Sequence, residues 1–496
     1  MRRTLIVALV LAAAVVLAGC ASAPEYQPPP VDIDAPDMWT ARDLDTAAVA
    51  TNNTRWWQDF GVADLDSVVE EALLQNYDLV AAAARVEQAA AIAGIVGADK
   101  WPQLSAGLNA GRRKNILLGI PIPGDKSVHS NSFGVSLDAR WEIDLWGRIN
   151  KAQTAALAEV EASWADLAGA RLSIAAQTAK AWFALTEARQ QVDLAEQTVA
   201  SFQTSADYVR NRYQQGVRTS LDVRLALANL AGAEALLELR YQQLDRSRRQ
   251  LEILLGRYPA GAIEGEPDLP PMPPSLPGGL PSELLIRRPD LVAAERRYAG
   301  TQAKISESRR AFFPRITLTG AAGTLSEQVD DLVKGDFSVW SLAAGLTQPI
   351  FQGGRLRANL AQSHAVADQA LASYVLSLLR AFGEVEMMIV AEQRLAKRVE
   401  YAQEAADQSV AAQDLAQRQY SAGLTEYITV LETQRRALIS VSDLITVRRE
   451  RLEARINLHV ALGGGFDLED QWEQFLVAQS SQQTETEQSE ASGEDQ

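Results

Sequence analysis

The sequence predicts a membrane α/β protein with an internal tandem duplication, in which strand pairs contribute to a shared β-barrel and long helices pack as coiled coils. Three observations support this fold class. Motifs recur at a nearly constant spacing, two segments alternate between apolar and polar residues, and two stretches of about 65 residues contain no proline. Together they indicate two equivalent halves, each with strands and one very long helix.

The duplication divides the chain. Early matches are offset by 212 residues and later ones by 207. The early matches pair Leu73, Asp78–Ala82 and Trp101-Pro102 with Leu285, Asp290–Ala294 and Phe313-Pro314; the later ones pair Gly147-Arg148, Tyr213 and Leu255-Gly256 with Gly354-Arg355, Tyr420 and Leu462-Gly463. The difference arises between the strands, where a surface loop tolerates a change in length. We expect a first repeat at 63–256, a Pro-rich linker at 257–281 and a second repeat at 282–464.

Composition argues against several classes of protein. A net charge of −16 disfavours a nucleic-acid partner. Cys20 is the only cysteine, so one chain can form neither a disulfide nor a cysteine metal cluster, and the three histidines lie far apart in sequence. We therefore expect no enzyme, no metal and no cofactor. Residues 465–496 are expected to form an acidic, largely disordered tail.

The first nineteen residues are typical of a lipoprotein signal peptide. A basic start precedes an apolar run that is too short to span a bilayer, and the run ends in Leu17-Ala18-Gly19-Cys20. This ending resembles the lipobox of bacterial lipoproteins, which implies acylation of Cys20 and, with Ala21 following it, sorting to the outer membrane. Residues 20–62 would then be a lipid-anchored tether. The alternative is an ordinary secretory signal with a chance cysteine.

Period-two alternation predicts the strands. Between Phe133 and Ile143 every odd position is apolar or small and every even position is polar or glycine. Such a segment, about eleven residues long, suits a membrane strand with lipid on one face and water on the other. The residues expected to face lipid are Phe133, Val135, Leu137, Trp141, Trp340 and Leu342. Partner strands are expected near Leu104–Gly111 and Ile316–Gly323, and the alternative is an amphipathic strand of a soluble sandwich.

Four strands cannot close a transmembrane barrel, because such barrels need about eight strands or more. An open sheet edge is not tolerated in lipid. The chain is therefore expected to share its barrel with copies of itself. Two copies would give a barrel filled by side chains, whereas three would leave a channel.

The prolines are absent from 148–215 and 355–422, so each stretch is predicted to be a helix roughly 100 Å long. In the first, apolar positions follow a 3.5-residue repeat, which is typical of coiled-coil packing. Shorter helices are predicted at 63–98 and 220–255, with no membrane-spanning helix in the mature chain. A fibrous dimer would explain the helices but not the alternating strands.

In their order along the chain, many short motifs resemble the TolC-like outer-membrane efflux proteins, lipoprotein branch. They are Trp56-Trp57 with Phe60, Asn76 with Asp78-Leu79, Trp141 to Arg148, Arg288 to Leu291 with Ala294-Glu295, Phe313-Pro314, Pro349 to Phe351 with Gly353 to Arg355, and Tyr420 with Gly423. The resemblance covers nearly the whole mature chain. It implies a homotrimer with a twelve-stranded β-barrel, continuous with an α-helical barrel that extends into the periplasm.

The resemblance also implies function. Such a channel conducts drugs or other small toxic compounds outward, and it docks onto a periplasmic adaptor and an inner-membrane pump, expected to be proton-driven. The periplasmic gate would comprise Tyr420, Ile428, Glu432 and Arg435, with Ile428 as an apolar ring and Glu432 as an acidic one. Two turns are expected to contact the adaptor; they consist of Gly216, Val217, Arg218, Thr219, Gly423, Leu424, Thr425 and Glu426.

Two other classes remain possible on sequence alone. A passive porin or protein-secretion duct would also have the barrel strands. A lipid-anchored structural coiled-coil protein would have the helices, provided that the strands are not in lipid. Conductance in a planar bilayer separates channel from scaffold, and loss of drug or solvent tolerance on deletion separates efflux from passive diffusion.

Overall fold

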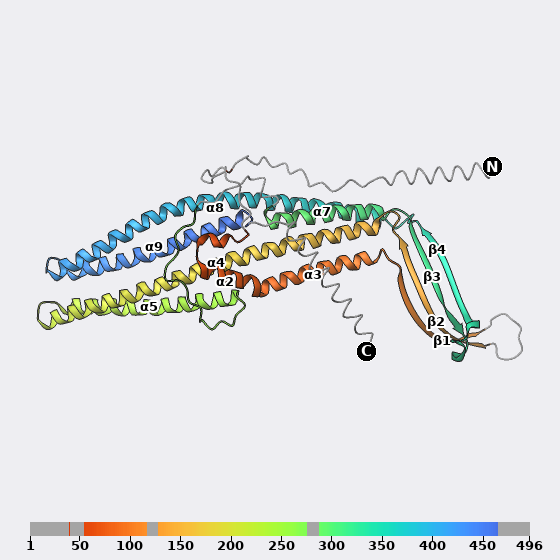
Figure 1. The fold of residues 1–496 in the computed structure, drawn as a ribbon, viewed down its shortest axis with the longest axis horizontal. Coiled ribbons are helices and arrows are strands. Elements are labelled where there is room, and N and C mark those ends of the chain that lie inside the picture. Colours follow the sequence, from red (N-terminus) through yellow and green to blue (C-terminus); the bar gives the residue numbers. More distant parts are fainter. Residues whose placement is uncertain (1–38, 40–53, 117–126, 275–286, 465–496) are drawn as a thin grey trace. The chain divides into compact units, whose positions relative to one another are not determined.

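The computed structural model describes residue 39 and residues 54–116, 127–274 and 287–464 (Figure 1). The predicted acylation site Cys20, most of the predicted tether, part of the predicted linker and the predicted C-terminal tail lie outside these residues. The described chain divides into two compact units. One comprises Val86–Ser163 and Ala294–Tyr374, and the other comprises the described parts of Asp32–Arg85, Trp164–Ala293 and Val375–Gln496.

The first unit contains one four-stranded antiparallel sheet in the order β1-β2-β3-β4. The strands are β1 (Gln103–Ile116), β2 (Ser127–Ile143), β3 (Arg315–Ser326) and β4 (Ser338–Thr347). Each half of the chain thus supplies one hairpin, and β2 pairs with β3 to join them. Short 3-10 turns, η3 (Val329–Asp331) and η4 (Gly335–Phe337), lie between β3 and β4.

The predicted strands are confirmed, with two changes at their ends. The first hairpin is longer than expected, since β1 continues to Ile116 and β2 begins at Ser127. The alternation of apolar and polar residues in the second half predicts a last strand that runs from Trp340 to Ile350. The observed strand is shorter at this end, because β4 ends at Thr347 and leaves Gln348 and Ile350 outside it. Pro349 explains this end, because proline cannot donate a backbone hydrogen bond to a ladder.

The helices confirm the duplication. The long helices α4 (Arg148–Gln214) and α8 (Arg355–Ser421) each have 67 residues, and α5 (Ser220–Leu254) and α9 (Tyr427–Ala461) each have 35. The first and last residues of α8 lie 207 positions after those of α4, and the same offset relates α9 to α5. Asp144 caps α4, since its carboxylate accepts hydrogen bonds from the backbone N–H groups of Ile149 and Asn150 at 3.1 and 2.7 Å.

The prediction of one helix at 63–98 was wrong, because Asn76 separates α2 (Ala63–Gln75) from α3 (Tyr77–Ala98). Asn76 has an extended ψ of 126°, and its side-chain oxygen accepts from the N–H of Asp78 at 2.8 Å. Its amide nitrogen donates to the carbonyl of Leu254, the last residue of α5, at 2.9 Å. The break is therefore fixed by a contact with a distant helix.

The second repeat has an equivalent junction before α7 (Pro289–Arg310). Arg288 occupies the position of Asn76, offset by 212, and donates at 3.2 Å to the carbonyl of Ala461, which ends α9. Its guanidinium also pairs with Asp290 and Glu384, both at 2.8 Å. The carbonyls that a helix leaves free at its C-terminus need a donor, and each half supplies a different one.

The core of the second unit lies around α2, α4 and α5. Aromatic residues of the 3-10 helix η1 (Trp56–Phe60) pack there, and Phe60 meets Phe183 edge-on with 5.2 Å between ring centroids. Three apolar residues of the linker pack against the same core: Ile263, Leu269 and Met272. The described part of the linker is thus held against the helices.

Glu252 fixes the start of the linker. This buried residue of α5 accepts hydrogen bonds from the backbone N–H groups of Gly261, Ala262 and Ile263 at 2.6, 2.7 and 3.2 Å. Desolvation acts to raise the pKa of this carboxyl, but the three backbone donors outweigh it and the pKa is lowered. The charged form therefore holds the turn.

Helix α3 bears on the expectation that the mature chain has no membrane-spanning helix. By length and composition alone it is apolar enough to cross a membrane, with a mean hydropathy of 1.6, to which its many alanines contribute. Such a result for one helix is weak, since core helices meet the same criterion.

Candidate functional site

The strand register gathers the apolar side chains on one face of the sheet, which we call the apolar face. Val135 opposes Leu108 of β1 and Thr324 of β3, whereas Leu137 opposes Ala106 and Ala322. Directly opposed residues point to the same face of a sheet. The face thus contains all six residues expected to contact lipid: Phe133, Val135, Leu137, Trp141, Trp340 and Leu342. Trp340 and Leu342 are 81% and 77% exposed. Contact with lipid stays a prediction.

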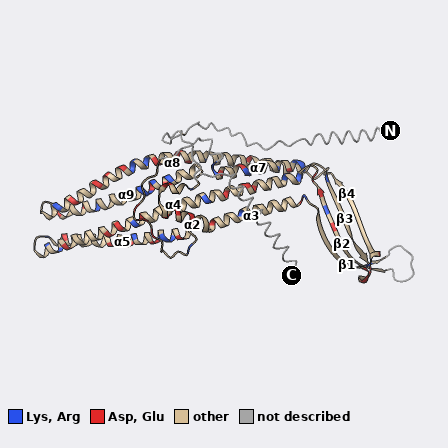
Figure 2. Ribbon diagram, viewed as in Figure 1, with Lys and Arg blue, Asp and Glu red and all other residues tan. Residues whose placement is uncertain are grey.

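The opposite face, which we call the polar face, carries every carboxylate of the four strands. Asp138 and Glu142 lie there with Arg140 between them, and the charged positions of β2 alternate in sign (Figure 2). Ser136 donates to Asp138 at 2.8 Å, and Arg148 at the start of α4 pairs with Glu142 at 2.9 Å. Polar groups so arranged suit a water-filled interior.

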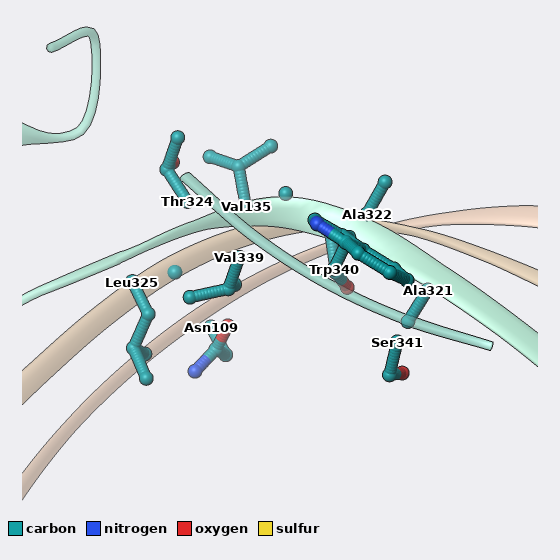
Figure 3. Close-up of a pocket in the computed structure, with 12 residues that line it drawn as sticks. Asn109, Val135, Ala321, Ala322, Thr324, Leu325, Val339, Trp340 and Ser341 are labelled. Carbon is teal, nitrogen blue, oxygen red and sulfur yellow. The ribbon is translucent and has the colours of Figure 1, made fainter. Parts of the chain in front are cut away.

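Small residues allow neighbouring strands to approach closely near the hairpin ends. A Cβ at Gly323 would overlap the backbone of Val135, and the side chain of Asn109 lies over Gly134. Residues around these glycines line a hollow of about 220 Å³ (Figure 3), in which Asn109, Leu325 and Trp340 take part. The hollow includes residues of both faces, so it belongs to the curved sheet itself and carries no separate ligand site.

The two predicted turns join α4 to α5 and α8 to α9. In each, a glycine with positive φ follows the long helix, 76° at Gly216 and 79° at Gly423. Val217 and Leu424, one residue later, are 56% and 78% exposed. Thr219 caps α5 in a reciprocal capping box with Asp222, whereas Glu426 precedes α9 without a side-chain cap. The turns therefore present apolar side chains to solvent.

Beside these turns lies a cluster of aromatic rings, which we call the tyrosine cluster: Tyr208, Tyr420 and Tyr427. Tyr420 is 1% exposed, and its ring centroid lies 5.8 Å from that of Tyr208 and 5.3 Å from that of Tyr427. The guanidinium carbon of Arg218 lies 4.3 Å from the Tyr420 centroid, a cation–π contact. Burial raises the pKa of Tyr427 to about 12.

The other three predicted gate residues lie on α9. Ile428 and Glu432 are exposed, and Glu432 pairs with Arg435 at 3.0 Å and with Arg436 at 3.5 Å. A hydrogen bond from Arg435 is the main reason that the pKa of Glu432 is lowered. Within one chain, Arg435 thus braces a carboxylate of its own helix. Tyr420 is buried in the cluster instead of sharing the exposed surface of Ile428.

A row of polar contacts between α4 and α9 was not predicted. Gln191 donates to the carbonyl of Ser442 at 3.0 Å, and Glu187 accepts from Thr446 at 2.8 Å and pairs with Arg449. Polar pairs at helix interfaces specify register, because a shift would leave buried groups unpaired. A heptad repeat is recognised by its apolar positions, so the repeat in α4 does not indicate these polar residues.

Arg455 is the most buried of the charged side chains that link α9 to its surroundings. Its side chain is 4% exposed, pairs with Glu392 of α8 and donates to the carbonyls of Pro273 and Pro274 in the linker. Nearby, His459 stacks on Trp56 at 5.1 Å, and burial lowers the pKa of His459 to about 3. Since burial and the charge of Arg455 both disfavour the protonated form, His459 stays neutral beside the guanidinium.

No group of three His, Cys, Asp or Glu residues suitable for a metal ion occurs within the described ranges. The residues singled out by sequence instead fall into two separate places. The apolar and polar faces of the sheet belong to the first unit, and the turns with the tyrosine cluster belong to the second.

Comparison with known proteins assigns a family to this arrangement. The family model described as outer membrane efflux protein matches residues 68–257 and 280–464. These two matches follow the two repeats of the chain.

Individual relatives agree with that match. The chain is 33% identical to the pyoverdine export outer membrane protein OpmQ of Pseudomonas aeruginosa, over 93% of this chain and 97% of that protein. It is 32% identical to the outer membrane protein OprJ of the same species, over 92% and 95%. The probable outer membrane lipoprotein SilC of Salmonella typhimurium is 28% identical, over 91% and 97%.

Solved structures give the same result. The outer-membrane channel OprN superposes with a TM-score of 0.80 at 28% identity, covering 89% of this chain and 99% of that one. The CmeC outer membrane channel of Campylobacter jejuni superposes with a TM-score of 0.82 at 25% identity, covering 90% and 95%.

Proposed function

The chain belongs to the outer membrane efflux protein family and is an efflux channel of the Gram-negative outer membrane, and we propose that it acts as a homotrimeric exit duct. In this proposal three chains share one barrel, and a periplasmic adaptor links them to an inner-membrane pump. The pump, expected to be proton-driven, supplies the energy. The channel itself catalyses no reaction.

The observation that carries the proposal is the sheet with two faces and two open edges. β1 and β4 each pair with one neighbour in the described chain, so each presents an unpaired edge. Open edges are not tolerated in lipid, and joining β4 of one copy to β1 of the next removes them. Three copies give a barrel of twelve strands with the polar face inward, and a barrel of this size is wide enough to enclose a channel.

Conductance of purified protein in planar bilayers tests this assembly. We expect discrete conductance steps from a species with the mass of three chains. A charged substitution at Ser136, on the polar face, should change the conductance, whereas the same change at Thr324, on the apolar face, should reduce insertion. A monomer that conducts, or a trimer that never does, would contradict the proposal.

The turns between the helix pairs are proposed as the adaptor-binding surface. Val217 and Leu424 support this assignment, because exposed apolar side chains at a helix end suit a partner protein. Single cysteines at Arg218 or Thr425, carrying a crosslinker, should capture the adaptor in cells. A cysteine at Asp330, on the β3–β4 connection, is the control; capture from this position alone would reverse the orientation.

The gate is proposed where Ile428 and Glu432 face solvent on α9. Threefold symmetry would turn them into an apolar ring and an acidic ring, which favours cations at a narrow end. The double variant Glu432→Ala with Arg435→Ala should raise the closed-state conductance. The matched control is Glu450→Ala, which removes a half-buried carboxylate, paired with Arg398 of α8, far along the same helix. Equal closed-state conductance in both variants would remove these residues from the gate.

The exported compounds are proposed to be drugs or other small toxic molecules. Deletion of the gene should lower tolerance to such compounds, and a gene copy that keeps both adaptor-binding turns intact should restore this tolerance. Relatives carry different cargo by name, pyoverdine for OpmQ and toluene for TtgF. Unchanged tolerance to every compound tested, with normal conductance, would favour a passive porin.

The proposal also includes a lipid on Cys20. Acylation adds membrane affinity of about 0.8 kcal/mol per buried CH₂. Cys20→Ser should therefore impair processing while leaving conductance of the assembled channel unchanged. An intact mass that shows an unmodified Cys20 at the mature N-terminus would refute this part.

A further inference from the structure

We propose that the hairpin end of the apolar face binds a phosphate-bearing lipid headgroup of the outer leaflet, through Arg112 and Lys114. The inference rests on the proposed barrel, because it takes the apolar face to contact lipid. It adds a binding site that neither the efflux function nor the family assignment requires.

The register places the two cations. Arg112 and Lys114 are on even positions of β1, the positions that carry Leu104, Leu108 and the rest of the apolar face. Arg113, between them, opposes Ser130 and points to the polar face. The apolar face thus changes along β1 from aliphatic residues to two cations without changing side.

Two residues of the neighbouring strand β2 lie beside these cations, and we call the four residues together the patch. Asn131 of β2 lies opposite Arg112, and His129 lies opposite Lys114, both on the same face. All four residues are exposed. His129 and Asn131 lie on the strand next to β1 and directly opposite the two cations. A ligand that rests on this face can therefore contact all four residues of the patch.

Charge complementarity indicates an anion. Among the described strand residues, the carboxylates Asp138 and Glu142 both lie on the polar face, so the apolar face carries cations alone. Within the described part of the chain, neither Arg112 nor Lys114 has an ion-pair partner. A guanidinium matches phosphate oxygens with two parallel hydrogen bonds, and an ammonium adds a point charge.

The height of the patch matches a headgroup. Arg112 and Lys114 are eight and ten residues beyond Leu104. At about 3.4 Å per residue this is about 27 and 34 Å along the strand. A tilt of about 40° reduces the height to about 21 and 26 Å, close to the roughly 25 Å of an apolar barrel band. The cations therefore lie where acyl chains give way to headgroups.

An amphiphile fits the surface as a whole. Its acyl chains would rest on Leu108 and Val135, and its phosphate would meet the cations above them. The two cations lie on β1, the strand that follows α3 along the chain, and at the end of β1 farthest from Gln103. In the proposed orientation this end reaches the outer leaflet.

The competing occupant is a second copy of the chain. The β3–β4 connection contains Asp330, Asp331 and Asp336, and in a trimer it would lie near β1 of the next copy. Asp331 already pairs with Lys334 at 2.5 Å. The lipid is favoured because the patch is on the face of the sheet, in line with the apolar band, and not on its edge alone.

Native mass spectrometry of the detergent-purified trimer with added lipid A tests the proposal. Lipid A carries phosphates on its sugar headgroup, and chemically dephosphorylated lipid A is the comparison. We expect wild type to retain lipid A and to bind the dephosphorylated form at least tenfold more weakly. This comparison needs no variant, so it holds even if a substitution prevents assembly.

Three variants then locate the site. Arg112→Gln with Lys114→Gln should weaken lipid A binding at least tenfold, and Arg112→Lys with Lys114→Arg should keep it. Arg113→Gln is the matched control, because it removes a neighbouring cation from the opposite face. Wild-type binding by the first variant overturns the proposal.

The remaining outcomes separate this site from the barrel assignment. Loss of lipid A with Arg113→Gln but not with the paired variant would mean that the faces of the proposed barrel are reversed. A paired variant that dissociates into monomers with unchanged lipid bound per chain would assign the patch to the neighbouring copy. Equal binding of the phosphorylated and dephosphorylated lipids by wild type would refute phosphate recognition while leaving the channel intact.

Discussion

Replacing Tyr420 tests whether the tyrosine cluster holds the proposed gate closed. The ring is 1% exposed, between Tyr208 and Tyr427, with the Arg218 guanidinium carbon 4.3 Å from its centroid. Truncating a buried aromatic residue to alanine costs about 3–5 kcal/mol. About 0.5–2 kcal/mol of this belongs to the cation–π contact. Tyr420→Ala should therefore loosen the helix ends at the turns.

The hydroxyl provides the matched control. The Tyr420 oxygen is buried without a hydrogen-bond partner among the described residues. Tyr420→Phe removes that group and keeps the ring, so we expect the free energy of the closed state to change by no more than about 1 kcal/mol. Arg218→Gln removes the cation alone and should fall between the two, at about 0.5–2 kcal/mol.

Single-channel recording in planar bilayers measures the effect. Each 1.4 kcal/mol lost by the closed state alone changes the ratio of closed to open channels about tenfold. Tyr420→Ala should open spontaneously, Arg218→Gln less often, and Tyr420→Phe as rarely as wild type. If phenylalanine behaves like alanine, or if alanine leaves the closed state unchanged, then the cluster stiffens the helix ends without controlling the gate.

Three further predictions concern stability. Glu252→Gln should lower the melting temperature at pH 7, since hydrogen bonds to a charged group are worth about 1.5–3 kcal/mol. Folding lowers the pKa of Glu252, so this stabilisation is present above the unfolded pKa and is lost as the pH falls through the folded pKa. The variant should therefore lose less of its melting temperature on acidification than wild type does. Arg455→Ala should cost about 3–5 kcal/mol in unfolding free energy by leaving Glu392 unpaired, whereas the double variant Arg455→Met with Glu392→Leu should recover much of it. Leu137→Arg should cost about 2–4 kcal/mol on refolding into bilayers, and Ser136→Arg, on the polar face, should cost much less.

The sequence predicted the regular elements well because their signals are local. Helices α4 and α8 begin after glycines and end near glycines, and they contain no proline, so their bounds follow from composition. The strand faces follow from alternation. The repeat then placed α5 and α9, whose ends differ by 207 residues.

Tertiary contacts account for what the sequence left out. Arg218 was assigned to the exposed turn, yet it lies over Tyr420, which comes from the other half of the chain. No local pattern links two residues about 200 positions apart. The same reason explains why Glu187 and Arg449 went unnoticed between α4 and α9. The sequence shows which of these residues are charged, but only the packing of the helices shows which residues they contact.

The junctions at Asn76 and Arg288 indicate how the duplicated halves remain equivalent after their sequences diverge. At both, a side-chain donor satisfies the last carbonyl of a returning helix, that of Leu254 or Ala461. An amide is sufficient for that task, because one N–H group reaches one carbonyl. A guanidinium has donors to spare, and Arg288 uses them on Asp290 and Glu384. The second junction is therefore tied to α8 by an ion pair that the first lacks at Asn76. Equivalence between the halves thus lies in the hydrogen bond that each helix end requires, and not in the residue that supplies it.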